Sequence, residues 1–369
     1  MDHIDAVVNC VGVLQDGGAD STRAAHVEGA RTPFDACESQ NVRRVIQFSA
    51  MGADAEVGTA YARTKHEGDR DLMIRDLDRT IIRPSLVIAR GAYGGTALIC
   101  GLAGLPLLTP VIDSPARFHP IHMHELCKVV EKLLTPDGPV RAVIEAAGPE
   151  EANLRELIST HRRWLGLGST RFWVSPEWLT NLAFAIGDGL GAIGVRTPLR
   201  STARAQMAHD VGGDANAIPR HLGFAVRPYE QALNEEPASM QDRWHARLYF
   251  VKPAAYVLLA SFWIATGIVC LTTGRNGAMA LARRAGFGGL DAVTTIVGGV
   301  FDIVIGAAFL ISARLRRATL LFMAAVSVIY LAVLTWTLPE LWADPLGRLT
   351  KLVPFFALLA FIAAVDDER

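Results

Sequence analysis

A tyrosine and a lysine four residues apart have the types and spacing needed for acid–base chemistry. Tyr61 and Lys65 bound the run Tyr-Ala-Arg-Thr-Lys, and a spacing of four places two side chains on one face of a helix. A tyrosine with its ordinary pKa of about 10 is a poor base at neutral pH, and a nearby ammonium favours the ionised phenol. We therefore predict that Lys65 lowers the pKa of Tyr61; the alternative is an exposed helical pair without chemistry.

The elements around this pair alternate between strand and helix. Apolar runs and helical spacing predict strands at 4–11, 44–49, 80–88 and 142–147, and helices at 22–40, 60–76 and 153–165. This alternation predicts an α/β fold with a parallel, doubly wound sheet. Ser49 ends the second strand, at the edge where such sheets bind ligands. We expect its hydroxyl to bond the substrate oxygen while Tyr61 exchanges a proton.

The order of these motifs resembles the short-chain dehydrogenase/reductase superfamily. The motifs are Asn-x-x-Gly after the first strand, Ser49, Tyr61 with Lys65, and then Arg-Pro-Ser at 83–85. Within that superfamily the chain resembles the atypical, NmrA-like branch, which includes the nucleotide-binding accessory subunit of respiratory complex I. The resemblance implies a Rossmann-like domain over residues 1–167 that binds NAD or NADP and a small-molecule substrate.

The same resemblance assigns roles to individual residues. Ser49, Tyr61 and Lys65 would be catalytic, with Lys65 also contacting the cofactor ribose. The remaining cofactor-binding residues would be Asn9, Gly12, Pro84 and Ser85.

The glycine-rich turn that opens such domains has no counterpart before Tyr61. The first strand resembles the fourth strand of the family, so we expect an N-terminally incomplete sheet. A Gly-x-Gly-x-x-Gly does occur at 189–194. Because it follows an apolar, helix-like run rather than a strand, we interpret it as a connection and not as a phosphate loop.

The last third of the chain is apolar. Only 17 of the 73 charged residues fall in 249–369, and spans are predicted at about 253–273, 290–313, 318–338 and 349–365, with the last the shortest. This region, 248–369, resembles the DoxX-like four-helix transmembrane domain. Residues 168–247 are predicted to be a helical substrate-side or connecting region.

The basic residues favour one orientation weakly. Seven lie on the side of the N-terminal domain and five on the other, which places that domain in the cytoplasm and the spans in the cell (inner) membrane. The N-terminus lacks the basic and apolar pattern of an export signal. Five scattered cysteines argue against a disulfide framework.

Asp302 lies deep in the second predicted span, where a charge costs roughly 2.5 to 3.5 kcal/mol. Gly298, Asp302 and Gly306 recur every four residues, with Gly299 beside them, and predict a small-residue stripe that a neighbouring helix approaches closely. We expect the carboxyl group to be hydrogen-bonded inside the bundle; the alternative is a site for a proton or a quinone headgroup.

Three histidines at 119, 122 and 124 suggest a metal site by composition. Their frame is similar to a strand and turn that precede a late helix in the same superfamily, so we expect a structural turn and no bound metal.

Together these features predict a membrane-anchored NAD(P)-dependent oxidoreductase or epimerase-like protein. A quinone or a membrane protein complex is a further predicted partner, whereas a net charge of −1 argues against nucleic acid. Two alternatives stay open: a non-catalytic NAD(P)H-binding or assembly protein, and a truncated product that does not bind nucleotide alone.

Overall fold

The computed structural model describes residues 4–17, 20–53, 58–91, 93–192, 197–207, 212–345 and 347–366. The chain divides into two compact units, Met1–Arg247 and Leu248–Arg369. The boundary falls within one long helix, α10 (Met240–Leu271).

A parallel sheet forms the centre of the first unit, as predicted. Its strands are β1 (Ala6–Asn9), β2 (Arg44–Phe48), β3 (Asp78–Pro84) and β7 (Ala142–Ala146), in the order β1-β2-β3-β7. Ala6 pairs with Arg44, Arg44 with Asp78, and Thr80 with Ala142. β1 lies at one edge of this sheet. Because all four strands run the same way, their carboxyl ends share one edge.

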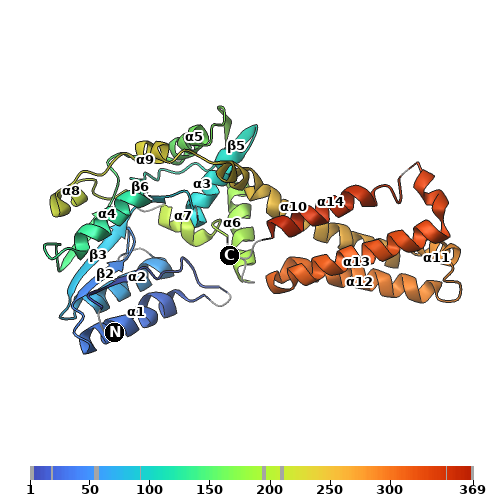
Figure 1. The fold of residues 1–369 in the computed structure, drawn as a ribbon, viewed down its shortest axis with the longest axis horizontal. Helices are drawn as coiled ribbons and strands as arrows, with labels where there is room; N and C mark the ends of the chain where they lie inside the picture. The colour runs from blue at the N-terminus through green and yellow to red at the C-terminus, as the bar shows by residue number, and fades with distance from the viewer. Residues whose placement is uncertain are drawn as a thin grey trace. The chain divides into compact units, whose positions relative to one another are not determined.

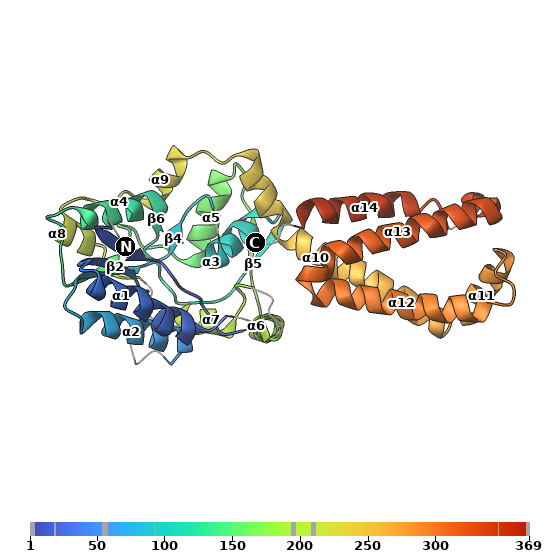
Figure 2. The same ribbon diagram turned by 60° about the horizontal axis from the view of Figure 1, so that its bottom comes forward.

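Successive residues of the central strands point to opposite faces of the sheet and enter two separate cores. Val45 and Ile81 pack with residues of α1 (Gly29–Ser39) and α2 (Ala60–Met73). Ile46 and Ile82 pack on the other face with residues of α4 (Met123–Leu134) and α8 (Ala217–Leu222). The two pairs of helices are seen on opposite sides of the strands (Figure 1; Figure 2). Burial on both faces explains the continuous apolar runs of these strands.

Helix caps set the start of two predicted helices. The Thr59 side chain accepts a hydrogen bond from the backbone N–H of Ala62 and starts α2. Asn153 and Glu156 form a reciprocal capping box at the start of α5 (Leu154–Trp164). The predicted helices therefore begin where a side chain satisfies free N–H groups.

Shorter elements complete the first unit. The third predicted strand ends at Pro84 and resumes as β4 (Val87–Ile88), which pairs with β6 (Ile121–His122). The remaining elements are a π-helical turn at Ala24–Glu28 before α1, α3 (Gly94–Gly104), β5 (Leu108–Val111), β8 (Arg171–Val174), α6 (Glu177–Ala192), α7 (Ser201–Met207) and α9 (Tyr229–Glu235). His122 and His124 lie at the predicted strand and helix start.

The Gly-x-Gly-x-x-Gly motif lies at the end of α6, apart from its last glycine, which is outside the described residues. A Cβ on Gly191 would lie 1.0 Å from Nη1 of Arg200. This glycine therefore makes room for an arginine, and its helical setting does not provide a phosphate loop.

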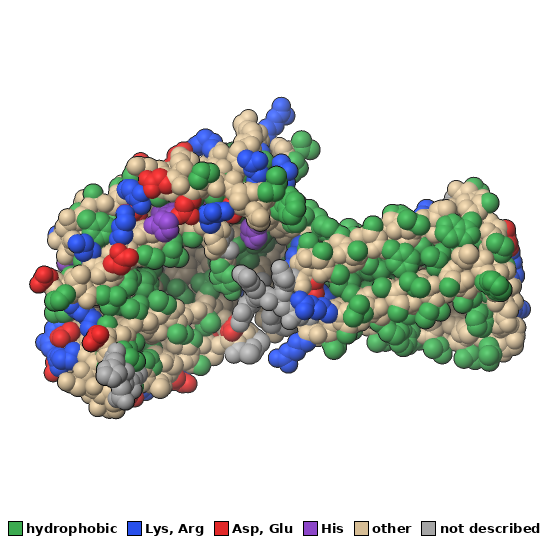
Figure 3. Space-filling view, in the orientation of Figure 1, with side chains coloured by type: hydrophobic (Ala, Val, Ile, Leu, Met, Phe, Trp, Pro, Cys, Tyr) green, Lys and Arg blue, Asp and Glu red, His purple; other side chains and the backbone are tan. Residues whose placement is uncertain are grey.

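The second unit is helical and apolar. Its elements are α10, α11 (Arg275–Arg284), α12 (Asp291–Ile311), α13 (Ala313–Thr337), a 3₁₀ turn at Pro339–Ala343 and α14 (Leu352–Val365). Side chains of α10, α12, α13 and α14 share one core, with Phe309, Met323 and Ile362 fully buried. Hydrophobic side chains are spread over the visible outer face of these helices, with the few charged ones near their ends (Figure 3). Leu258, Leu321 and Trp336 are exposed apolar residues of this unit, as expected for a lipid-facing surface.

Three described helices, α10, α12 and α13, are long and apolar enough to cross a membrane. α14 has 14 residues, about 21 Å of helix, which is short of the hydrocarbon core of about 30 Å. The predicted fourth span is therefore shorter than expected. The arginines at 314, 316 and 317 lie in the first turns of α13 and not in a loop.

Two glycines of α12 allow close contact with α10, but one glycine of the predicted stripe does not take part. Cβ atoms on Gly299 and Gly306 would lie 2.9 Å from Leu271 Cγ and 2.8 Å from Ile264 Cγ1 of α10. A Cβ on Gly298 would meet no atom within 4 Å. The contacting residues are thus seven apart, the spacing of a helix seam, and Gly298 faces away from it.

Asp302 lies beside this seam, half-buried, and a Cβ on Gly267 would lie 3.1 Å from its Cβ. In the described part of the chain its carboxylate has no hydrogen bond or ion pair. The expected hydrogen bond inside the bundle is therefore not found, although Cys270 and Tyr330 lie within electrostatic reach.

We predict that Gly306→Val destabilises the helical unit by about 1 to 3 kcal/mol, because the new methyl groups overpack the contact with α10. The thermal midpoint of the full chain in detergent micelles measures this change. Gly298→Val is the matched control and should leave the midpoint unchanged. Equal midpoints for the two variants would show that α10 and α12 do not meet at Gly306.

Candidate functional site

Lys65 joins the carboxyl ends of two strands. Its side chain is 4% exposed, and Nζ donates hydrogen bonds to the carbonyl oxygens of Val11 at 3.2 Å and Phe48 at 2.9 Å. These carbonyls follow β1 and end β2. A Cβ on Gly12 would lie 3.2 Å from Nζ. The ammonium and a glycine backbone therefore lie together at the edge where ligands bind to such sheets.

Tyr61 lies one turn before Lys65 on α2, as predicted, but its environment differs from the expectation. Burial, and then the negative charge of Asp69, raise the pKa of the Tyr61 phenol to about 12. Burial also lowers the pKa of Lys65, against the opposing effects of Asp69 and Cys10. The Lys65 ammonium is hydrogen-bonded to backbone carbonyls rather than to the phenol. Burial and the Asp69 carboxylate therefore determine the pKa of the Tyr61 phenol. The shift therefore favours the protonated phenol.

Asp69 is a site residue that the sequence analysis did not identify. It is 1% exposed, its Oδ2 accepts a 2.6 Å hydrogen bond from Ser49 Oγ, and Arg83 Nη2 lies 3.5 Å from the same oxygen. Burial raises the pKa of this carboxyl group, opposed by Ser49, Arg83 and Lys65. Asp69 therefore connects the predicted serine, tyrosine and lysine. Its position one helical turn after Lys65 was the available signal.

His26 is a second residue that the sequence did not reveal. Its Nε2 accepts the backbone N–H of Val13 at 3.0 Å, so its Nδ1 donates to Thr64 Oγ1 at 2.8 Å. Its ring packs edge-on against Tyr61 with centroids 5.5 Å apart. Burial, and then the Lys65 charge, lower the pKa of His26 to about 4. The neutral ring holds the segment after β1 against the helix that carries Tyr61.

The other predicted cofactor-binding residues lie at the ends of neighbouring strands. Asn9 Nδ2 donates to Gln47 Oε1 at 2.7 Å, while Asn9 Oδ1 accepts the N–H of Val11 at 3.1 Å. Asn9 thus shapes the turn after β1. Pro84 ends β3, and the Ser85 hydroxyl oxygen accepts the N–H of His119 at 3.3 Å. The fold therefore brings the predicted residues to one edge of the sheet.

These residues fit one end of a nicotinamide dinucleotide. The backbone at 10–12 is exposed, Gly12 has no side chain beside the Lys65 ammonium, and Ser49 and Tyr61 supply hydroxyl groups nearby. An ammonium and an open glycine backbone suit a ribose and its nicotinamide. The glycine motif of α6 does not supply the turn that binds the pyrophosphate.

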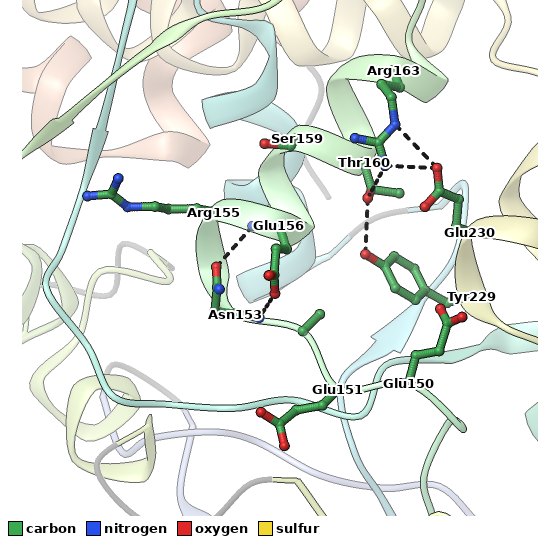
Figure 4. A pocket seen from close by; sticks show the side chains of 11 residues that line it. Glu150, Glu151, Asn153, Arg155, Glu156, Ser159, Thr160, Arg163, Tyr229 and Glu230 are labelled. Atoms are coloured by element: carbon green, nitrogen blue, oxygen red, sulfur yellow. Dashed lines mark hydrogen bonds and ion pairs between the residues drawn. The ribbon is translucent and has the colours of Figure 1, made fainter.

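A separate cavity of about 410 Å³ lies at the start of α5. It is lined by Glu150, Glu151, Ala152, Asn153, Arg155, Glu156, Ser159, Thr160, Arg163, Tyr229 and Glu230. Figure 4 shows Arg163 paired with Glu230 and Tyr229 bonded to Thr160. None of the predicted site residues lines it. Its four carboxylates disfavour a dinucleotide phosphate, so we do not place the cofactor there.

Comparisons with known proteins identify two segments. Residues 1–98 match the NAD(P)H-binding family, and residues 260–360 match the DoxX-like family. The mitochondrial 40 kDa subunit of NADH-ubiquinone oxidoreductase from Neurospora crassa is 23% identical over 155 residues, 42% of this chain and 40% of that protein. The 3-demethoxyubiquinol 3-hydroxylase of Cupriavidus necator is 33% identical over 121 residues, 31% of this chain and 57% of that protein. The chain thus spans about half the length of these relatives.

Solved structures resemble the first unit at low identity. RMD from Pseudomonas aeruginosa, complexed with NADPH, is 14% identical, with a TM-score of 0.47, over 67% of this chain and 83% of that one. A nucleoside-diphosphate-sugar epimerase from Staphylococcus aureus is 13% identical, with a TM-score of 0.47, over 63% and 77%. The two family matches, over residues 1–98 and 260–360, agree with the NAD(P)H-binding and DoxX-like segments that the sequence predicts.

We predict that acid destabilises the first unit through His26. Its pKa is lower folded, about 4, than unfolded, about 6.5, so the unfolded chain binds more protons between these values. The free energy of unfolding should fall as pH decreases from about 6.5 towards 4, by up to about 1.4 kcal/mol per pH unit. Denaturant unfolding of the full chain in micelles measures this slope. His26→Gln should reduce it, whereas His221→Gln, at an exposed position, should keep it; equal slopes would contradict the assignment.

Proposed function

We propose that this protein is a membrane-anchored NAD(P)-dependent oxidoreductase or epimerase-like enzyme of the short-chain dehydrogenase/reductase type. The observation that carries the proposal is the convergence of Ser49, Tyr61 and Lys65 around Asp69 at the carboxyl edge of the sheet. Acid–base groups of perturbed pKa at such an edge are typical of catalytic sites.

In this proposal Asn9, Gly12, Lys65, Pro84 and Ser85 hold the cofactor. Bound NAD(P)H supplies a hydride to a carbonyl carbon. Tyr61 holds the proton that the carbonyl oxygen needs, because a phenol with a pKa of about 12 stays protonated at neutral pH. Lys65 fixes the turn after β1 through its bond to the Val11 carbonyl.

Ser49 orients the substrate oxygen, and Asp69 controls how it does so. While Asp69 is ionised, the Ser49 hydroxyl donates to it and its proton is not available to a substrate. When Asp69 is protonated, it can donate to Ser49 Oγ and leave the serine proton free for the substrate oxygen. The raised pKa of Asp69 favours the protonated form.

The membrane unit sets where this chemistry takes place. We propose that the N-terminal domain lies in the cytoplasm and the helices in the cell (inner) membrane, because seven basic residues against five favour that orientation. Asp302, without a bonded partner among the described residues, is compatible with a quinone headgroup.

A second candidate function is non-catalytic. The similarity to a subunit of NADH-ubiquinone oxidoreductase favours a protein that binds NAD(P)H and stabilises a membrane complex. The Ser49 hydroxyl is hydrogen-bonded to Asp69, and the Lys65 ammonium is hydrogen-bonded to two backbone carbonyls. Such bonds also fit a purely structural role for these side chains.

We predict that Tyr61→Phe lowers the rate of hydride transfer by at least about 100-fold, since it removes the proton donor. NAD(P)H oxidation by the full chain in lipid nanodiscs, with a panel of aldehydes, ketones and quinones, measures this rate. Tyr93→Phe, which removes an exposed phenol of the first unit, is the matched control.

Cofactor affinity separates the two candidates. An enzyme loses turnover in Tyr61→Phe while its NAD(P)H affinity stays within a few fold. A wild-type chain that binds NAD(P)H but turns over none of these acceptors, or a variant with undiminished turnover, favours the non-catalytic function.

A further inference from the structure

Two histidines and a glutamate from distant parts of the first unit meet away from the Tyr61 site. His122 ends β6, His124 is in the first turn of α4, and Glu236 follows α9. One ring nitrogen of each histidine and one carboxylate oxygen of Glu236 all lie within 4.8 Å of one another. His124 Nδ1 lies 3.1 Å from Glu236 Oε1. The fold thus gathers three potential metal ligands at one point.

The polar atoms in this cluster are incompletely satisfied. His122 is 1% exposed, and its Nε2 has no hydrogen-bond partner among the described residues. Its Nδ1 faces the backbone N–H of His124 at 3.4 Å, a long contact. Glu236 Oε1 is also buried and makes no hydrogen bond in the described part of the chain, although His124 Nδ1 lies within ion-pair distance of it. Buried polar groups without partners are costly, so a ligand that engages both would stabilise the fold.

The charge around the cluster suits a cation. A neutral imidazole nitrogen and a carboxylate oxygen are both metal-ligand atoms, and the cluster offers two of the first and one of the second. The charged groups that face the His122 ring are Glu236, Arg227 and Glu125. Arg227 is paired with Glu125 and with Glu235, and Lys128 also contacts Glu125. Together, the carboxylates of Glu125, Glu235 and Glu236 carry one more charge than the cations of Arg227 and Lys128. This excess negative charge favours an incoming cation.

We propose that His122, His124 and Glu236 bind a divalent late transition metal ion, with Zn²⁺ as the best fit. Two imidazoles and a carboxylate are typical zinc ligands, and water completes the four-coordinate shell. Zn–N bonds of about 2.0 Å place tetrahedral ligands roughly 3.3 Å apart, close to the 3.1 Å between His124 and Glu236. The side chain of His124 is 62% exposed and has room to adjust.

The site would fasten the end of α9 to the start of α4. The indole Nε1 of Trp164 donates to the backbone oxygen of Glu236 at 2.8 Å, so the main chain there is already held and only the side chain has to turn. The metal ion would then add a cross-link between two segments far apart in the sequence. This site is independent of hydride transfer, since none of its residues lies among those assigned to the nicotinamide cofactor.

Zinc binding by the full chain in nanodiscs, purified without a polyhistidine tag and stripped with a chelator, tests the proposal. Metal analysis after equilibration with zinc chloride should give one ion per chain, and zinc should raise the thermal midpoint. Co²⁺ in place of zinc should give the absorption spectrum of a four-coordinate ion with nitrogen and oxygen ligands.

Variants identify the ligands. His124→Ala and Glu236→Gln should each weaken zinc binding by at least about 100-fold, since loss of outer contacts alone costs 10–100-fold. His221→Ala, which removes an exposed histidine elsewhere, should bind zinc like the wild type. Because His122 is buried and its variant could misfold, the decision rests on the other two. No zinc in the wild-type chain, or unchanged affinity in both variants, overturns the proposal.

Discussion

The candidate site depends on one buried ammonium group. Lys65 Nζ bonds the carbonyl oxygens that follow β1 and end β2, and the negative charge of Asp69, one turn later on the same helix, favours the ammonium. A buried charge is tolerated only when hydrogen bonds or opposite charges stabilise it. Lys65 therefore fixes α2 to the strand ends, and with it the positions of Tyr61 and Ser49. Its role as a structural tie and its proposed role in cofactor binding use the same atom.

Desolvation is the main influence on the pKa values of the titratable groups around Lys65. The phenol of Tyr61, the carboxyl group of Asp69 and the imidazole of His26 are all shifted towards their neutral forms, with burial as the largest cause in each case. A buried phenol that stays protonated is suited to giving a proton to a substrate oxygen in such a site. The site would be poorly suited to binding a strongly charged substrate at the same point.

The core of the membrane unit is held together mainly by close packing of apolar side chains. Gly299 and Gly306 allow the backbones of α10 and α12 to approach, and Phe309 fills the core beside them. Polar contacts occur at one end of the bundle, where Tyr256 donates to Asp366 at 2.8 Å and Arg316 pairs with the same carboxylate. In hydrocarbon, such packing is a main source of helix association.

The parallel sheet, the helix that carries Tyr61 and Lys65, the strand that ends just before Ser49 and three apolar spans could all be predicted from the sequence. These features depend on local periodicity and on spacing along one element. The surroundings of these groups could not be predicted in this way. The packing of separate elements decides whether Lys65 faces a phenol or a carbonyl. It also decides whether Gly298 or Gly299 meets a neighbouring helix, and whether His124 meets Glu236. Burial then sets the pKa of each group, and burial is a property of the assembled fold that no single segment contains.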